Sequence, residues 1–113
     1  ALPILIKELA GKGYRLFCLS NMSLEFYDYL KEREVFRYFE GQIISAHEKL
    51  IKPEKEIYRI LIDRFQAYPE DTLFIDDLKE NVDAARQLGF HTVHFADKEK
   101  GYREINKILC SEF

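Results

Sequence analysis

The chain has few cysteines, no excess of basic charge and no long apolar run. Its 2 cysteines are too few for a secreted domain stapled by disulfides, which favours a reducing, cytoplasmic location. A net charge of −3 does not form the basic footprint that nucleic-acid binding requires. The apolar run at the amino terminus is interrupted by Pro3 and Lys7 and is too short to span a bilayer. We therefore expect neither nucleic acid nor a membrane as a partner.

What is present is typical of one globular domain. The chain has 113 residues, of which 47% are hydrophobic and 33% charged. This length and balance suit a single hydrophobic core, and no internal repeat or linker interrupts the pattern. We therefore expect residues 1–113 to form one domain.

Helical and strand patterns alternate along the chain. Apolar spacing predicts helices within residues 2–10, 23–30, 53–65, 82–88 and 102–109, and compact apolar runs predict strands at residues 14–19, 41–45, 72–75 and 92–95. Pro53 fits the first turn of its helix, and Pro69 is expected to break that helix. This alternation predicts an α/β fold with a parallel sheet and helices on both faces. In such sheets, ligands bind beyond the carboxyl ends of the strands.

Ser20 and Asn21 directly follow the first predicted strand. A hydroxyl beside a new helix start can hydrogen-bond an anion such as phosphate. The alternative is a simple turn with a helix cap, because Ser and Asn are common turn residues.

Lys52 lies just before a predicted helix, in the segment Leu-Ile-Lys-Pro-Glu. From such a position an ammonium group can reach a phosphate as a point charge. The alternative is a solvated surface lysine.

Asp76 and Asp77 close an apolar strand as adjacent carboxylates. Like charges this close raise each other's proton affinity unless a cation neutralises them. Mg²⁺ prefers oxygen ligands and takes one or two protein carboxylates, with water and substrate phosphate completing its shell. A helix cap is the alternative for the pair. Taken together, a hydroxyl, an ammonium and a carboxylate pair are the parts that a phosphate site needs.

Three segments resemble, in order, motifs of the haloacid dehalogenase (HAD)-like hydrolase superfamily. They are residues 19–21 (LSN), residues 51–58 (IKPEKEIY) and residues 69–77 (PEDTLFIDD). The resemblance extends from Leu2 to about Phe95, and it is closest to the branch of sugar-phosphate phosphatases and the amino-terminal phosphatase domain of soluble epoxide hydrolases. It implies a Rossmann-like core and a small phosphorylated metabolite as substrate.

The resemblance also implies roles for the candidate phosphate-binding residues. Ser20 would hydrogen-bond the phosphoryl oxygens, and Asn21 would shape that loop. Lys52 would act in catalysis by neutralising the charges of the nucleophile and the phosphoryl group.

For the metal, the resemblance implies Mg²⁺ with Asp77 as its direct ligand. Asp76 would support the metal shell or pair with the lysine. Asn81 would lie in the outer shell of the site.

One motif of that superfamily is missing. The resemblance implies an Asp-x-Asp at the end of a first strand, in which the first Asp attacks phosphorus and the second is the general acid and base. No Asp-x-Asp occurs in the 113 residues, and the sequence begins where the helical cap of such proteins would end. We therefore expect the first strand and the cap to lie on an amino-terminal segment of a longer parent chain, and these residues alone to be inactive.

Three functional interpretations follow. The leading one is a Mg²⁺-dependent phosphomonoester hydrolase that works through an aspartyl-phosphate, and a phosphomutase stays open beside it. The second is a truncated, non-catalytic pseudo-phosphatase or interaction module. The third, a response-regulator receiver domain, is disfavoured because its acid pair would come first along the chain. His47, His91 and His94 lack ligand spacing and are expected to be packed or surface residues.

Overall fold

A computed structural model describes residues 2–21 and 37–110. These residues fall into two compact units, Ala1–Ile51 and Lys52–Phe113, which we call the amino-terminal and carboxyl-terminal units. The helix predicted at residues 23–30 lies outside the described residues. That residues 1–113 form one domain stays a prediction.

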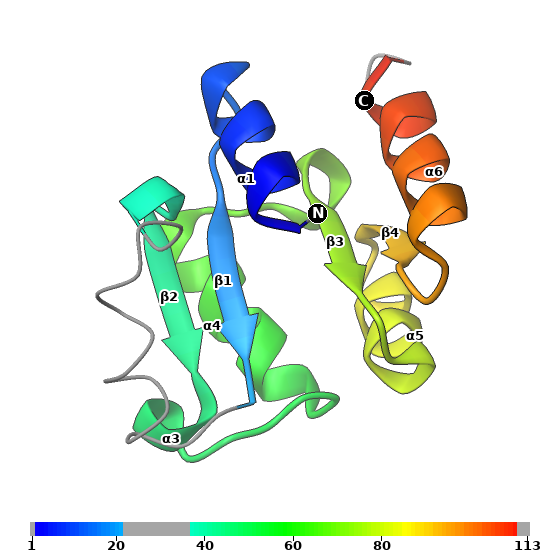
Figure 1. Cartoon of the computed structure of the whole chain (residues 1–113). Helices are drawn as coiled ribbons and strands as arrows, with labels where there is room; N and C mark the ends of the chain where they lie inside the picture. Colours follow the sequence, from blue (N-terminus) through cyan, green and yellow to red (C-terminus); the bar gives the residue numbers. More distant parts are fainter. Residues whose placement is uncertain (1, 22–36, 111–113) are drawn as a thin grey trace. The chain divides into compact units, whose positions relative to one another are not determined.

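The amino-terminal unit contains a parallel pair of strands. Its elements are α1 (Leu2–Gly11), β1 (Phe17–Ser20), β2 (Gly41–Ile44) and α3 (Ser45–Glu48) (Figure 1). β1 and β2 pair so that Leu19 lies opposite Ile43 and Ser20 opposite Ile44. Both isoleucines are fully buried, which places the core of this unit at β2.

The first strand begins later than the sequence predicts. Tyr14 donates its backbone N–H to the carbonyl of Leu9 at 3.2 Å, so the chain after α1 still completes the end of that helix. Gly13 makes this possible, because its φ of 89° is a conformation that side chains disfavour. The strand therefore begins at Phe17 and includes Ser20 as its last residue. Ser45, expected in the second strand, instead begins α3.

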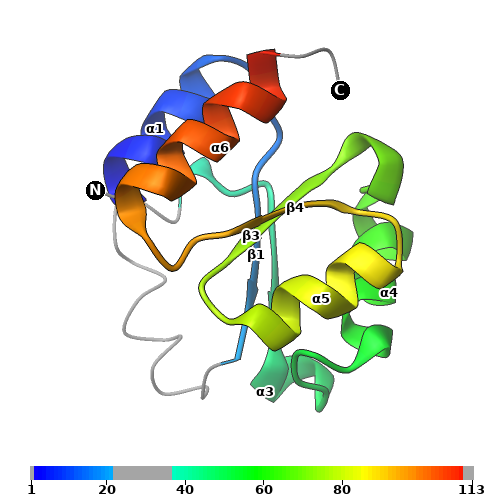
Figure 2. The ribbon, with the colours of Figure 1, turned by 90° about the vertical axis from the view of Figure 1, so that its right-hand side faces the viewer.

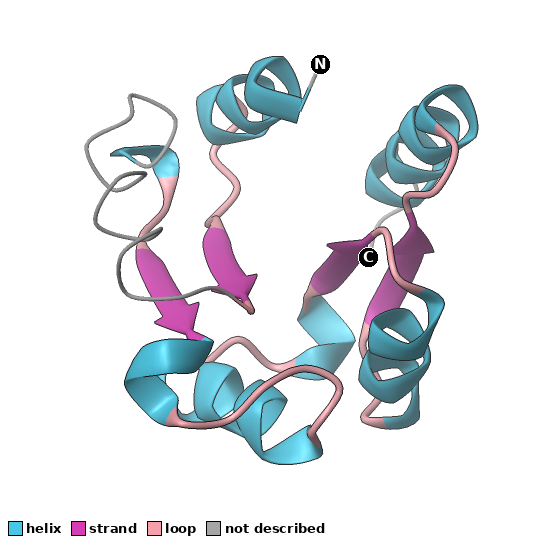
Figure 3. Cartoon of the chain, turned by 60° about the horizontal axis from the view of Figure 1, so that its bottom comes forward, coloured by secondary structure: helices cyan, strands magenta, loops and turns pink. Residues whose placement is uncertain are grey.

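The carboxyl-terminal unit has the alternation that the sequence predicts. Its elements are α4 (Lys55–Phe65), η2 (Pro69–Asp71), β3 (Leu73–Asp76), α5 (Lys79–Gln87), β4 (His91–His94) and α6 (Lys98–Cys110). β3 and β4 are parallel, with Asp76 opposite His94. The pair lies between α5 on one side and α6 on the other in all three views (Figures 1, 2 and 3), so helices cover both faces as expected.

An apolar core joins α4 to this strand pair. The buried side chains of α4 are Ile57, Tyr58 and Leu61. The ring of Tyr58 meets that of Phe74 edge-on at 5.4 Å between centroids, a preferred aromatic geometry. Val93 of β4 is also buried. This packing fixes where α4 begins relative to the end of β3.

Two prolines do not act where the sequence predicts. Pro53 precedes α4 instead of lying in its first turn, since Glu54 is the N-cap and Lys55 the first helical residue. Pro69 begins η2, whereas α4 already ends at Phe65, followed by Gln66 with a φ of 54°. The left-handed turn at Gln66 therefore ends the helix before the proline can.

The described strands form two separate two-stranded parallel sheets, β1–β2 and β3–β4. Among the described residues, no helix is both long and apolar enough to cross a membrane.

Candidate active site

The end of β3 brings two carboxylates to the start of α5. Asp76 is the last residue of the strand and Asp77 the first residue after it. The backbone carbonyl of Asp76 accepts a hydrogen bond from the N–H of Phe95 at 2.7 Å, one residue beyond β4. The strand pairing thus continues to the point where the acids leave the sheet.

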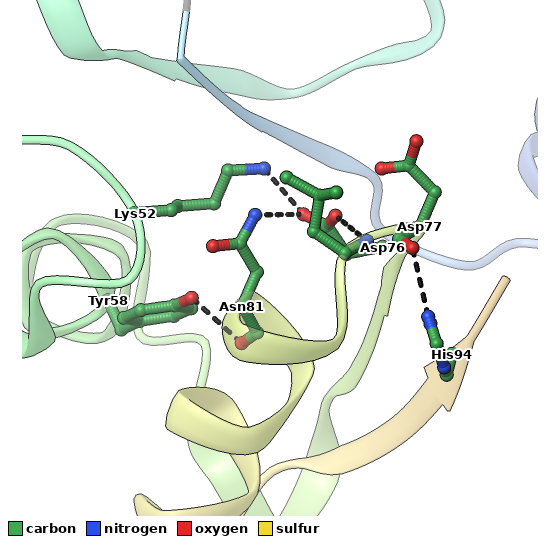
Figure 4. A network of polar contacts seen from close by, with 7 residues as sticks. Lys52, Tyr58, Asp76, Asp77, Asn81 and His94 are labelled. Atoms are coloured by element: carbon green, nitrogen blue, oxygen red, sulfur yellow. Dashed lines mark hydrogen bonds and ion pairs between the residues drawn. The ribbon is translucent and has the colours of Figure 1, made fainter. Parts of the chain in front are cut away.

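Asp76 and Lys52 form a buried ion pair. Lys52 Nζ lies 2.6 Å from Asp76 Oδ2, and the two side chains are only 11% and 6% exposed. Asn81 donates its amide to the same oxygen at 3.3 Å, and the backbone N–H of Leu78 donates to Asp76 Oδ1 at 2.9 Å (Figure 4). Both oxygens of this carboxylate therefore have donors.

These donors decide the ionisation state of Asp76. Burial by itself would raise the pKa of its carboxyl, because desolvation disfavours the charged form. The hydrogen bonds from Lys52 and Leu78, together with the charge of Lys52, outweigh burial and lower the pKa below its usual value. Asp76 is therefore a carboxylate at neutral pH.

Asp77 has a different environment. Its side chain is exposed, and its carboxylate lies beside that of Asp76 (Figure 4), where a side-chain hydrogen bond between the two acids also helps to lower the pKa of Asp76. Its backbone carbonyl lies 2.9 Å from His94 Nε2. The two acids therefore differ in kind, since one is buried in an ion pair and the other is exposed.

Tyr58 connects α4 to this network of hydrogen bonds. Its hydroxyl is buried and donates to the backbone carbonyl of Asn81 at 2.9 Å (Figure 4). Burial, and next the negative charge of Asp76, raise the pKa of Tyr58 above its ordinary value. The tyrosine therefore stays a neutral donor and links α4 to the first turn of α5.

The carboxyl-terminal unit brings together four of the six residues expected at the site. They are Lys52, Asp76, Asp77 and Asn81. Ser20 and Asn21 belong to the amino-terminal unit, where Ser20 ends β1 half-buried and Asn21 follows it exposed.

The sequence does not predict two members of this network. Tyr58 falls inside the second motif, and its position on the buried face of α4 is the signal for its role. His94 is expected to be an ordinary packed or surface residue. His94 ends the strand that follows the acid pair in the sequence. Neighbouring parallel strands end at the same edge of a sheet, so this position could have indicated the contact with Asp77.

The oxygen ligands at this site fit Mg²⁺ better than a metal whose ligands must all come from the protein. Among the described residues, no three His, Cys, Asp or Glu side chains gather into a metal cluster. Asp77 offers one exposed carboxylate, and both oxygens of Asp76 already have donors. Mg²⁺ commonly takes one or two carboxylates and leaves its other positions to water and phosphate.

Known proteins resemble the chain in sequence. It is 32% identical over 80 residues to bifunctional epoxide hydrolase 2 of Rattus norvegicus, a match that covers 71% of the chain and 14% of that protein. It is 28% identical over 106 residues to the sesquiterpene phosphatase astK of Aspergillus oryzae, covering 93% of the chain and 54% of the relative. The chain thus spans about half or less of these relatives.

Structure and family comparisons agree with this similarity. A HAD family enzyme of Bacteroides thetaiotaomicron, solved in complex with magnesium and inorganic phosphate, matches with a TM-score of 0.72 and 30% identity over 79% of the chain and 48% of its own length. The family model described as haloacid dehalogenase-like hydrolase matches residues 4–89. The resemblance of the three segments is therefore confirmed, and the chain belongs to the haloacid dehalogenase-like hydrolase family.

Proposed function

We propose that the protein carrying this chain is a Mg²⁺-dependent phosphomonoester hydrolase that acts on a small phosphorylated metabolite in the cytoplasm. The observation that carries this proposal is the buried pair of Lys52 and Asp76 beside the exposed carboxylate of Asp77. The ammonium of Lys52 can attract a phosphate, and the accessible carboxylate of Asp77 can bind the Mg²⁺ that accompanies it, at one place. The family and the phosphatase among the relatives support the same function.

Lys52 would stabilise the charge of the phosphoryl group. An ammonium has three donors, and Asp76 accepts from one of them at 2.6 Å. Asp76 thereby fixes the direction of the side chain, and an ammonium held in this way can also donate to the anionic oxygens of a bound phosphate. Because the Lys52 side chain is only 11% exposed, the attraction of its ammonium for an anion is screened less than that of a surface lysine.

Asp77 would bind the metal ion, with Asn81 in the outer shell through Asp76. Bound Mg²⁺ would polarise a phosphoryl oxygen and neutralise charge that develops during transfer. As the family resemblance implies, Ser20, at the carboxyl end of β1, would hydrogen-bond phosphoryl oxygens, and Asn21 would shape that loop.

The nucleophile would come from outside these 113 residues. A carboxylate that attacks phosphorus breaks the ester P–O bond, and the alcohol leaves with a proton from the second Asp; water then hydrolyses the aspartyl-phosphate to inorganic phosphate. Because no Asp-x-Asp occurs in the sequence, we propose that a preceding segment of the parent chain supplies the two aspartates. The same observation supports the second candidate, a non-catalytic protein that keeps the metal-binding half of the site.

Two measurements separate these candidates. Sequencing the gene upstream of the codon for Ala1 tests for a strand that ends in Asp-x-Asp. The full protein is then assayed on a generic phosphate ester with and without Mg²⁺. We expect turnover that needs Mg²⁺ and that falls on the order of 100-fold in Asp77→Asn, because a carboxylate that binds the metal is lost.

Asp63→Asn is the matched control. Asp63 is also exposed and lies on α4 of the same unit, so its substitution removes one negative charge away from the site. Its turnover should equal that of the wild type. An unchanged rate in Asp77→Asn would exclude the proposed metal site, and absence of both the upstream motif and the activity would leave the non-catalytic candidate.

A further inference from the structure

His94 contacts the main chain of the residue that we expect to bind the metal. It is the last residue of β4 and lies opposite Asp76 in the register of the two strands. Its Nε2 is 2.9 Å from the backbone carbonyl oxygen of Asp77 (Figure 4). Phe95, the next residue, donates its N–H to the carbonyl of Asp76 at 2.7 Å. The end of β4 therefore provides a donor for each of the two aspartate carbonyls.

In this contact His94 must be the hydrogen-bond donor. A carbonyl oxygen can only accept a hydrogen bond, so Nε2 of His94 must carry a proton. Neutral imidazole meets this condition in one tautomer, and the charged form meets it always. The contact thus needs the Nε2–H form and does not need a charge.

The link between β3 and α5 consists of Asp77 and Leu78. Leu78 is anchored by its N–H to Asp76 Oδ1 at 2.9 Å, and Asp77 by its carbonyl to His94. Each residue of this short link is thus anchored by hydrogen bonds, and Leu78 is held further because its carbonyl accepts from the N–H groups of Asn81 and Val82. A carboxylate on an anchored main chain loses less conformational freedom when it binds a cation, and residues that orient ligands in this way strengthen metal binding.

We propose that His94 is a positioning residue, which orients the exposed carboxylate of Asp77 for the cation by hydrogen-bonding its main chain. This inference rests on the proposed magnesium function. His94 itself neither binds the metal nor transfers a proton in this role.

The same strand offers a matched control. His91, at the other end of β4, is also exposed and also has its Nε2 2.9 Å from a backbone carbonyl, that of Glu70. His91→Leu therefore removes the same kind of contact, but at the end of β4 that is far from the acid pair. His94→Gln is the conservative variant, because the amide nitrogen of Gln can donate from about the position of Nε2.

The test follows the backbone amide signals of Asp77 and Leu78 by NMR during a Mg²⁺ titration. In His94→Leu, we expect faster hydrogen exchange at these amides and a midpoint at about tenfold higher Mg²⁺. His91→Leu should leave both unchanged, and His94→Gln should restore most of the wild-type midpoint.

Each other outcome contradicts a specific part of the inference. An unchanged midpoint in His94→Leu, with or without faster exchange, would overturn the positioning role. Equal effects of His94→Leu and His91→Leu would reduce His94 to a general contribution to stability and would overturn that role as well. If Mg²⁺ moves no signal in the wild-type protein, the proposed magnesium function and the metal part of this inference fail together. Faster exchange confined to His94→Leu would then still show the contact as an anchor of the link.

Discussion

Burial and charge act on Asp76 in opposite directions, and the balance depends on one lysine. Desolvation raises the pKa of the carboxyl, whereas the hydrogen bond and the charge of Lys52 lower it. Lys52 and Asp76 are 2.6 Å apart and both side chains are nearly buried. Removing either one would therefore leave the other as an uncompensated buried charge. Asp77, the neighbour of Asp76 in sequence, is exposed, so adjacent carboxylates have different chemistry.

Removal of Lys52 should therefore destabilise the protein strongly. In Lys52→Met, the buried carboxylate of Asp76 loses its cation, and we expect the free energy of unfolding in urea to fall by about 3 kcal/mol or more. The double variant Lys52→Met, Asp76→Asn should lose less than the sum of the single changes, because no uncompensated charge remains.

Lys79→Met is the control for this pair. Lys79 also contacts an aspartate, Asp83 at 3.2 Å, but the two side chains are 76% and 40% exposed. Its loss should change the free energy of unfolding by less than about 0.5 kcal/mol. Additive effects of Lys52→Met and Asp76→Asn would show that the two side chains do not interact in solution.

At the scale of elements, the site depends on how helices meet the end of β3. Tyr58 connects α4 to α5 through its hydrogen bond to the carbonyl of Asn81, and its ring packs on Phe74 of β3. α6 approaches the chain after β4 so closely that a Cβ added at Gly101 would overlap the ring of Phe95. Close contacts at Tyr58 and at Gly101 therefore constrain where α4 and α6 lie around the strand pair.

Tyr58→Phe should keep the ring packing and lose the link between α4 and α5. The carbonyl of Asn81 loses the hydrogen bond from this hydroxyl, so we expect the free energy of unfolding to fall by about 0.5–1.5 kcal/mol. Tyr68→Phe, at a tyrosine that is 51% exposed, should change it little.

Alkaline pH gives a second measure of the same residue. Because the folded pKa of Tyr58 is raised, its contribution to stability is fully present below the unfolded pKa of about 10 and is lost as pH rises towards the folded value. Tyr58→Phe should show a weaker loss of stability above that pH. Equal pH profiles for the two proteins would contradict a buried, neutral Tyr58.

Gly101→Ala should disturb the contact between α6 and Phe95. The added methyl would overlap the ring, which also packs edge-on against Tyr102 at 5.3 Å, so we expect a loss of roughly 1–3 kcal/mol in the free energy of unfolding. Gly11→Ala, in α1 with nothing within 4 Å of the added Cβ, should be neutral or slightly stabilising. Equal thermal unfolding of the two variants would argue against the close approach.

At the scale of the whole molecule, the chain carries part of what its relatives contain. It covers 54% of the sesquiterpene phosphatase and 14% of the epoxide hydrolase that it resembles. Its described strands form two separate parallel pairs, and each pair has one strand whose end bears candidate site residues, Ser20 on β1 and Asp76 on β3. The proposed activity therefore depends on the nucleophile that a preceding segment would supply.

The sequence by itself determined the family and the alternation of helices and parallel strands. Apolar periodicity is a local feature, so the helices within residues 2–10 and 82–88 could be predicted, and in the structure each is followed by a glycine of positive φ, Gly13 or Gly89. Lys52, Asp76 and Asp77 could also be named as candidates, because each belongs to a short motif that is contiguous along the chain. The start of β1 could not be predicted, because an apolar run does not show which of its backbone groups complete the preceding helix.

Only the tertiary structure decided how the candidates divide their roles. The packing of α4 and α5 against β3 decides which aspartate pairs with Lys52 and which is exposed. Two adjacent aspartates in a sequence do not show how their side chains are oriented. The contacts of Tyr58 with Asn81 and of His94 with Asp77 likewise join residues 23 and 17 positions apart. Such contacts arise because the chain folds back on itself, and they give a pair of identical carboxylates two different environments.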